Sequence, residues 1–212
     1  LDNLQRQIVH ETARVGTAKV ESAKATLGRI NPHVAVETWP TRLTSANALD
    51  IIAGYDIVAD GSDNFATRYL VSDACCLAGK PLVFAAVGPF DGYLTTFKPH
   101  ERTPKGEPWP TYRCLFPEPP PPGTVANCSE VGVLGSVVGV VGTLQATEVL
   151  KEILGLGDSL AGKLMIYDAL AARFETMRYA WDPDNPLTGR QASIRDLSIH
   201  ASTVDAATCA AE

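Results

Sequence analysis

The sequence lacks the features of a secreted or membrane-spanning protein. Only five of its 212 residues are cysteines, an odd number that includes the adjacent pair Cys75 and Cys76. This set is no disulfide framework, and it favours a reducing, cytoplasmic location. The longest nearly uncharged apolar run, residues 131–144, is shorter than the roughly 20 residues that cross a bilayer, and no signal peptide opens the chain. We therefore expect a cytoplasmic protein that makes no contact with a membrane.

Positive charge is also scarce. The chain has 18 Lys+Arg against 24 Asp+Glu, which gives a net charge of −6. A general nucleic-acid-binding surface needs clustered positive charge, so we expect no nucleic-acid partner. With 45% hydrophobic and 20% charged residues, the composition is that of a globular domain. A chain of this length buries a core without a disulfide or metal staple.

Apolar spacing predicts an alternation of helices and strands. Val20, Ala23, Leu27 and Ile30 recur at helical spacing before Pro32, which predicts an amphipathic helix of about 14 residues. The pattern further predicts helices over 46–53, 65–77 and 131–154, and strands over 34–38, 56–60, 81–87, 92–97, 163–167 and 173–179, the last two as a hairpin. Short connections favour an α/β fold, a Rossmann-like, doubly wound, mostly parallel sheet covered on both faces, with an antiparallel extension.

Proline and glycine are concentrated in the middle of the chain. Nine of the 15 prolines lie between residues 99 and 122. This predicts a long Pro-rich crossover loop over about 99–127 that is neither helix nor central strand. Loops of this length are usually functional or disordered. The predicted helix over 131–154 contains Gly132, Gly135, Gly139 and Gly142, each of which costs about 1 kcal/mol relative to alanine. Close packing of another backbone, from the sheet or from a second subunit, would explain them.

Two pairs of polar residues are candidates for ligand binding, and each also has a simpler interpretation. Arg6 and Lys19 are cations expected near strand and helix ends, where open α/β sheets bind ligands. Taken alone, each is more typical of a solvated surface charge. Asp63 and Asn64 follow a predicted buried strand and precede a predicted helix. One of them can cap that helix, or the Asp63 carboxylate can hold Mg²⁺ on a phosphate.

Cys128 is a candidate nucleophile. It lies at the exit of the Pro-rich loop, just before the glycine-rich helix, whose positive end favours the reactive thiolate. A loop that carries an activated thiol suits a transient acyl or sulfur acceptor. A lone cysteine is more often inert, and we expect Cys75 and Cys76 to be core residues.

Several short motifs occur in a fixed order along the chain. They are Asn3-Leu-Gln-Arg-Gln7, Val15-Gly-x-x-Lys19, Arg29-Ile-Asn-Pro32, Asp60-x-x-Asp63-Asn64, Tyr112-Arg-Cys-Leu-Phe-Pro117, Asn127-Cys128-x-Glu130 and Gly142-Thr-Leu-Gln-Ala146. Together they resemble the ThiF/MoeB family, the bacterial relatives of ubiquitin-activating enzymes, from Asn3 to about Tyr179.

This resemblance implies an ATP-dependent adenylyltransferase. Such enzymes activate the C-terminal glycine of a small ubiquitin-fold sulfur-carrier protein ending in Gly-Gly, for molybdopterin or thiamine biosynthesis. The residues that would bind ATP are Asn3, Leu4, Gln5, Arg6, Lys19 and Asn64, with Asn3, Arg6 and Lys19 on its phosphates. Asp63 would bind Mg²⁺, and Cys128 would form a covalent sulfur link with the carrier, so Arg6, Asp63 and Cys128 are the expected catalytic residues. The resemblance also implies a homodimer, with a sulfurtransferase or a cysteine desulfurase as a further partner.

The sequence departs from this family in three places. Many relatives hold zinc with two Cys-x-x-Cys pairs, but here the first pair reads Thr111-Tyr-Arg-Cys114 and residues 182–190 contain no cysteine, so we expect no zinc site. No Gly-x-Gly-x-x-Gly loop occurs, and the chain begins at Leu1 rather than Met. We expect a preceding strand–helix–strand unit of about 65 residues to carry that loop. Asp2 stands where relatives commonly have Ser, a mild change. The expected division is an N-terminally incomplete adenylyltransferase domain over 1–180 and an extension over 181–212, frayed from residue 201.

Two other functions are compatible with these observations. A non-catalytic relative would keep the carrier-binding groove without a complete nucleotide site, and an intact glycine loop upstream would argue against it. A nicotinamide-dependent oxidoreductase can share the doubly wound sheet. It gives no reason, however, for the motifs at residues 3–6 and 63–64.

Overall fold

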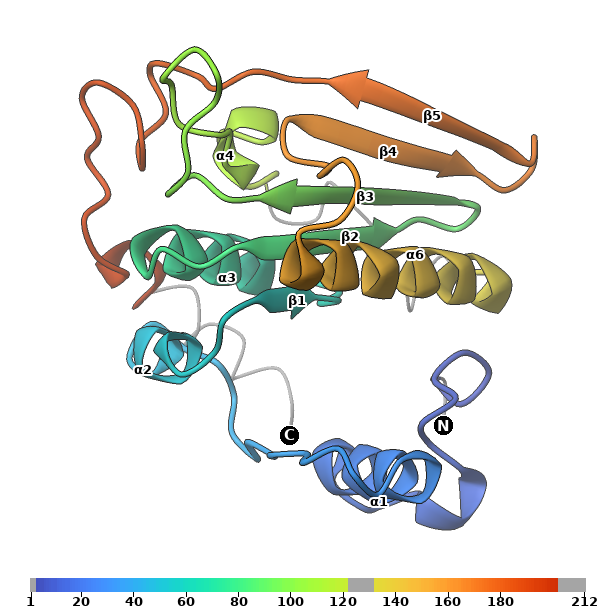
Figure 1. Ribbon diagram of the computed structural model, residues 1–212. Helices are drawn as coiled ribbons and strands as arrows, with labels where there is room; N and C mark the ends of the chain where they lie inside the picture. Colours follow the sequence, from blue (N-terminus) through green and yellow to red (C-terminus); the bar gives the residue numbers. More distant parts are fainter. Residues whose placement is uncertain (1–2, 122–131, 202–212) are drawn as a thin grey trace. The chain divides into compact units, whose positions relative to one another are not determined.

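The computed structural model describes residues 3–121 and 132–201. The chain divides into two compact units, Leu1–Arg42 and Leu43–Glu212, and each is described by itself. Figure 1 labels the helices and strands of both. Within the described ranges, no helix is long and apolar enough to cross a membrane.

The first unit is built around the helix α1 (Lys19–Ile30), which confirms the helix predicted before Pro32. The preceding segment folds onto α1 through polar contacts with the buried Ser22. The His10 ring nitrogen Nδ1 lies 2.9 Å from Ser22 Oγ, and Arg14 donates to the Ser22 carbonyl at 2.8 Å. The strand predicted over 34–38 is wrong, because these residues pair with no strand in the described chain. Instead, the Thr38 hydroxyl donates to the Glu21 carboxylate of α1 at 3.0 Å.

The second unit is a five-stranded sheet with helices. In chain order its main elements are α2 (Ala48–Ala53), β1 (Val58–Asp60), α3 (Phe65–Leu77), β2 (Leu82–Val87), β3 (Asp91–Phe97), α4 (Tyr112–Leu115), α6 (Gly135–Leu154), β4 (Lys163–Asp168) and β5 (Arg173–Arg178). The strand order is β1-β2-β3-β4-β5 (Figure 1). Only β1 and β2 are parallel, and all other neighbours are antiparallel.

The α/β class is confirmed, but the sheet of the described residues is mostly antiparallel rather than mostly parallel. Two tight reversals are the reason. At the first, between β2 and β3, the Gly88 N–H donates to the Asp91 carbonyl at 2.8 Å. At the second, between β4 and β5, the Asp168 side chain accepts the N–H groups of Leu170 and Ala171. A reversal this short joins antiparallel neighbours, whereas a parallel pair needs a longer crossover such as the one through α3.

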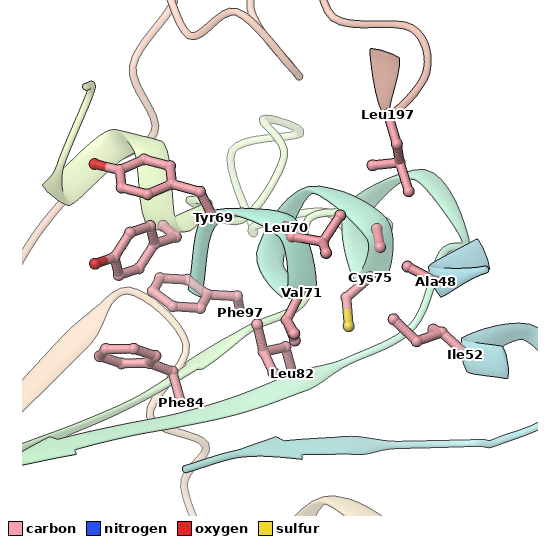
Figure 2. Close-up of a cluster of buried hydrophobic side chains, with 12 residues drawn as sticks. Ala48, Ile52, Tyr69, Leu70, Val71, Cys75, Leu82, Phe84, Phe97 and Leu197 are labelled. Carbon is pink, nitrogen blue, oxygen red and sulfur yellow. The ribbon is translucent and has the colours of Figure 1, made fainter. Parts of the chain in front are cut away.

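Helices cover both faces of the sheet, as expected. Successive side chains of β2 point to opposite faces. Leu82 and Phe84 pack in one core cluster with α2, α3 and α4 (Figure 2). Val83 and Ala85 pack in a second cluster with Val137 and Val141 of α6. The sheet therefore lies between α3 on one face and α6 on the other.

Close packing within the described chain explains a glycine in β3 but not Gly139 and Gly142 of α6. A Cβ atom at Gly92 would overlap the Val141 side chain, so α6 can approach β3 only at a glycine. Gly139 and Gly142 are exposed, and in the described chain no atom beyond the helix's own nearby backbone lies within 4 Å of their Cβ positions. The sequence predicted that these glycines allow close packing of the sheet or of a second subunit. Close packing of the sheet is thus excluded at Gly139 and Gly142.

Three segments differ in detail from the expectation. The Pro-rich segment contains one helical turn, α4, which Thr111 caps together with Cys114. The long helix begins at Gly135, and Val131 lies outside the described residues. The segment after Trp181 is turn-rich as predicted, yet it contributes buried apolar side chains to the second unit, at Leu187, Ile194 and Leu197. The predicted loop over 122–127 and the tail after residue 201 lie outside the description.

Candidate functional site

The Asn3–Gln7 motif forms a turn in the first unit. The backbone N–H groups of Arg6 and Gln7 both donate to the Asn3 carbonyl, at 3.0 and 2.9 Å, so Leu4 and Gln5 lie within the turn. The Asn3 side-chain oxygen accepts a hydrogen bond from Lys19 Nζ at 3.2 Å. The structure thus brings together two candidate residues that are 16 positions apart in the sequence.

A pocket of about 140 Å³ opens beside this turn. Its polar lining residues are Asn3, Gln7, His10, Glu11, Arg14, Thr17, Lys19 and Ser22. Gly16, at a φ of +91°, turns the chain toward α1, and Ala18 gives that helix no side-chain cap. An uncapped helix N-terminus attracts anions through its N–H groups and its partial positive charge. Glu11, which also lines the pocket, pairs with Arg14 at 2.9 Å and offsets its charge. The positive groups left for an anion such as a phosphate are Lys19 and the N–H groups at the start of α1.

The second pair of candidates lies where β1 ends and α3 begins. Asn64 is the N-cap of α3, because its Oδ1 accepts the Thr67 N–H at 2.9 Å. Its Nδ2 donates to Asp63 Oδ1 at 3.4 Å. The capping role therefore belongs to Asn64, and the exposed Asp63 carboxylate has the chemistry of a ligand for a hard cation.

Buried polar groups hold the loop that carries Asp63. Asp60 is 5% exposed, and its Oδ1 accepts the Ser62 N–H at 2.8 Å. Burial raises the pKa of Asp60, an effect that Ser62 and the positive charge of Arg68 oppose. Gln145 of α6 donates to the Asp60 carbonyl at 2.8 Å, which ties the carboxyl end of β1 to that helix. Asp60 thus has a structural role in this loop.

The candidate residues are divided between the two units. Asn3, Arg6 and Lys19 belong to the first, and Asp63 and Asn64 to the second. Side-chain hydrogen bonds join Asn3 to Lys19 and Asp63 to Asn64. Arg6 contacts Asn3 through its backbone N–H, and it is not among the residues that line the pocket. Cys128 lies outside the described residues.

The family of the chain follows from comparison with known proteins. Residues 1–187 match the ThiF family. The chain belongs to the ThiF family. It is 50% identical over 197 residues to a sulfur carrier protein adenylyltransferase of Thermus thermophilus, a match that covers 93% of this chain and 72% of that protein. It is 47% identical over 197 residues to a SAMP-activating enzyme E1 of Haloferax volcanii, a match that covers 92% of this chain and 70% of that protein.

Other relatives of this ThiF-family chain are longer. It is 45% identical over 184 residues to a probable adenylyltransferase/sulfurtransferase MoeZ of Mycobacterium tuberculosis, covering 87% of this chain but 46% of that protein. Among solved structures, E. coli MccB crystallised with ATP matches 88% of this chain and 55% of its own, with a TM-score of 0.72 and 18% identity. At that identity the likeness shows the fold alone, a ThiF-like, Rossmann-type arrangement.

Two residues that hold the loop between β1 and α3 were not identified from the sequence. Arg68 donates from Nε and an Nη atom to the Ser62 carbonyl, at 3.3 and 3.2 Å, and its guanidinium lies 5.4 Å from the centre of the Phe65 ring. Gln145 is the second, through its bond to the end of β1. The available signals were the position of Arg68 one helical turn after Asn64 and the place of Gln145 in the Gly-Thr-Leu-Gln-Ala motif.

The environment of the two cysteines within α3, Cys75 and Cys76, disfavours the thiolate form. Burial raises the pKa of Cys75 and of Cys76 to about 12 in each case. Cys75 is 1% exposed and belongs to the core cluster shown in Figure 2, as predicted, whereas Cys76 is partly exposed. Because the thiolate is the nucleophile, neither is a candidate for covalent catalysis.

Proposed function

We propose that this chain is the adenylyltransferase part of an enzyme that uses ATP to activate the C-terminal glycine of a ubiquitin-like sulfur-carrier protein, for molybdopterin or thiamine biosynthesis. Membership of the ThiF family and the names of the relatives support this proposal. The observation that carries it is the division of roles at the start of α3. Asn64 caps the helix and leaves Asp63 exposed just after β1, at the strand end where α/β sheets bind ligands.

The chain's own residues would act by alignment and by neutralising charge. When bound, Mg-ATP supplies the adenylyl group and the pyrophosphate leaving group. Lys19 and Arg6 are the cations proposed for its phosphates, and the hydrogen bond from Lys19 to Asn3 holds that ammonium in place. Asp63 supplies a carboxylate ligand of the kind that Mg²⁺ prefers. Since the ionised carrier carboxylate is itself the nucleophile, the catalytic requirement is orientation and electrostatic stabilisation rather than a protein base.

Further parts of the proposal concern partners. Cys128 would form the covalent sulfur link with the carrier, and a sulfurtransferase or a cysteine desulfurase would supply the sulfur. A second copy of the chain is the proposed neighbour of the exposed Gly139 and Gly142 on α6. The three described cysteines are free thiols, which suits a reducing, cytoplasmic location. The division into a domain over 1–180 and an extension over 181–212 belongs to the same proposal.

The test is carrier-dependent ATP–pyrophosphate exchange by the full-length protein, with a ThiS-type or a MoaD-type carrier ending in Gly-Gly. We expect Asp63→Ala to abolish exchange without lowering the thermal midpoint, because an exposed carboxylate has no packing role. Asp56→Ala is the matched control. It removes another exposed carboxylate, just before β1, and should leave exchange intact.

A second pair of variants separates the cap from the site. Asn64→Ala should lower the thermal midpoint, since loss of an N-cap costs about 1 kcal/mol, whereas Asn64→Asp keeps a good cap. Normal exchange by Asp63→Ala would contradict the proposed metal ligand. If no form of the protein exchanges pyrophosphate while the carrier still binds, the chain is the non-catalytic relative.

A further inference from the structure

A buried polar cluster joins α4 to the segment that follows β5. At its centre is Asn185, which is 1% exposed. Its Nδ2 donates to Thr111 Oγ1 at 2.8 Å and to Cys114 Sγ at 3.1 Å. Its Oδ1 accepts the N–H groups of Leu187 and Thr188, at 2.9 and 3.1 Å. An amide side chain has two donor and two acceptor positions, so Asn185 uses its full hydrogen-bonding capacity here.

The spacing in this cluster is that of a structural zinc site. Thr111 and Cys114 are three positions apart, as are Asn185 and Thr188. The ThiF/MoeB resemblance implies one Cys-x-x-Cys pair where Thr111 and Cys114 stand and a second pair near the C-terminus, where residues 182–190 contain no cysteine. A structural zinc ion takes four ligands, usually thiolates or imidazoles. This set offers one thiol, two hydroxyls and an amide, and the amide nitrogen already donates both of its hydrogens. These residues do not fit zinc.

We propose that the Asn185 cluster is a metal-free cross-link that takes the structural place of a zinc ion. Asn185 organises both sides at once: its oxygen folds residues 186–188 into a turn, and its nitrogen holds α4 across a gap of 74 residues in the sequence. Two neighbours complete the turn. Trp181 Nε1 donates to Thr188 Oγ1 at 3.2 Å, and Gly189 lacks the Cβ that would overlap the backbone of Asn185 and Pro183.

Such a cross-link behaves differently from a metal site. Zinc binding couples folding to thiolate formation and makes the fold sensitive to chelators. The Asn185 cluster holds its two segments with neutral hydrogen bonds. Its buried members are Thr111, Asn185 and Leu187, and Cys114 and Thr188 are partly buried. Removing the amide leaves the Thr111 hydroxyl and the 187–188 backbone N–H groups without these partners, and unpaired buried groups are costly.

The first experiment measures zinc content and thermal unfolding of the full chain. We expect far less than one zinc per chain and no change of midpoint with EDTA. Asn185→Ala should lower the midpoint by roughly 5 °C or more. Gln191→Ala removes an exposed amide from the same segment and should leave the midpoint unchanged. Stoichiometric zinc, a drop with EDTA, or an unshifted Asn185→Ala midpoint would each overturn the proposal.

The second experiment restores the thiols. The triple variant Thr111→Cys, Asn185→Cys, Thr188→Cys has four cysteines at the four positions, and we expect it to bind one zinc and to lose stability with EDTA. Cobalt gives an independent readout through its thiolate-to-metal absorption. The same triple variant with Cys114→Ser is the control and should bind metal more weakly. A folded triple variant that binds neither zinc nor cobalt would refute the proposal that these four positions have the geometry of a zinc site. If the triple variant does not fold, the zinc content and thermal unfolding of the first experiment decide whether the cluster is metal-free.

Discussion

The strongest stability effect should come from removing the charge of Asp73. This residue of α3 is fully buried and binds two distant side chains. Arg113 of α4 donates to its two oxygens, with the closest contact from an Nη atom at 2.8 Å, and His200 Nε2 lies 2.8 Å from Oδ2. Arg113 is only 5% exposed, and its guanidinium lies 4.9 Å from the centre of the Tyr69 ring. The Arg113 charge is therefore compensated inside the protein rather than by water.

Asp73→Asn keeps the size of the side chain but leaves the Arg113 cation buried without its counter-charge. Breaking a buried pair from one side costs about 3–5 kcal/mol. In a chain of this size each kcal/mol lowers the thermal midpoint by about 2–4 °C, so we expect a drop on the order of 10 °C. His200→Gln retains the Asp73–Arg113 pair and should cost about 1–2 kcal/mol, as for a single hydrogen bond.

The assay is urea unfolding monitored by circular dichroism, with a double variant that removes both partners of the pair. The double variant Asp73→Leu, Arg113→Met replaces the pair by apolar side chains and should be clearly more stable than Asp73→Asn. The reasoning is refuted if the free energy of unfolding of Asp73→Asn lies within about 1 kcal/mol of that of the parent protein. It is also refuted if the double variant is less stable than Asp73→Asn.

Two further predictions concern packing and pH. Gly92→Ala should destabilise by about 1–3 kcal/mol, because its methyl group would overlap the buried Val141. Gly139→Ala on the exposed side of α6 should instead stabilise the monomer by up to about 1 kcal/mol. If urea unfolding gives the same change in the free energy of unfolding for both variants, the packing of Gly92 against Val141 is contradicted. Since burial raises the Asp60 pKa, the stability due to this carboxyl is present below about pH 4 and lost as pH rises through its native pKa. Asp60→Asn should therefore gain stability relative to the parent between about pH 4 and pH 7. The prediction is ruled out if the difference in the free energy of unfolding between the variant and the parent stays constant over this pH range.

Elements with a long, regular apolar pattern could be predicted from the sequence. The helix at Phe65–Leu77 was predicted to the residue, and the hairpin of β4 and β5 nearly so. Strand pairing was not predictable in the same way, because it depends on partners far along the chain. Residues 34–38 have the composition of a strand, but a strand exists only where a second chain segment supplies its hydrogen bonds. The prediction of a mostly parallel sheet failed because of the two tight reversals, which join β2 to β3 and β4 to β5 as antiparallel neighbours.

The candidate site could be predicted in part. The motifs identified Asn3, Lys19, Asp63 and Asn64, and local geometry then distinguished the cap from the exposed carboxylate. Short-range rules name Asp and Asn as equal caps, so only the observed Thr67 bond could decide between them. The buried polar contacts were beyond sequence reasoning, since His200 binds a residue 127 positions away.

These contacts give the segment after residue 181 a definite place in the fold. Asn185 binds the turn that starts α4, and His200, beyond the end of the ThiF match, binds Asp73 in the middle of α3. The same α3 begins at Asn64, beside the proposed metal ligand Asp63. One rigid helix thus connects the candidate loop at its N-terminus with the residues that hold α4 and the C-terminal segment. A polar, turn-rich segment can be part of the core when its few buried side chains use their hydrogen-bonding groups fully.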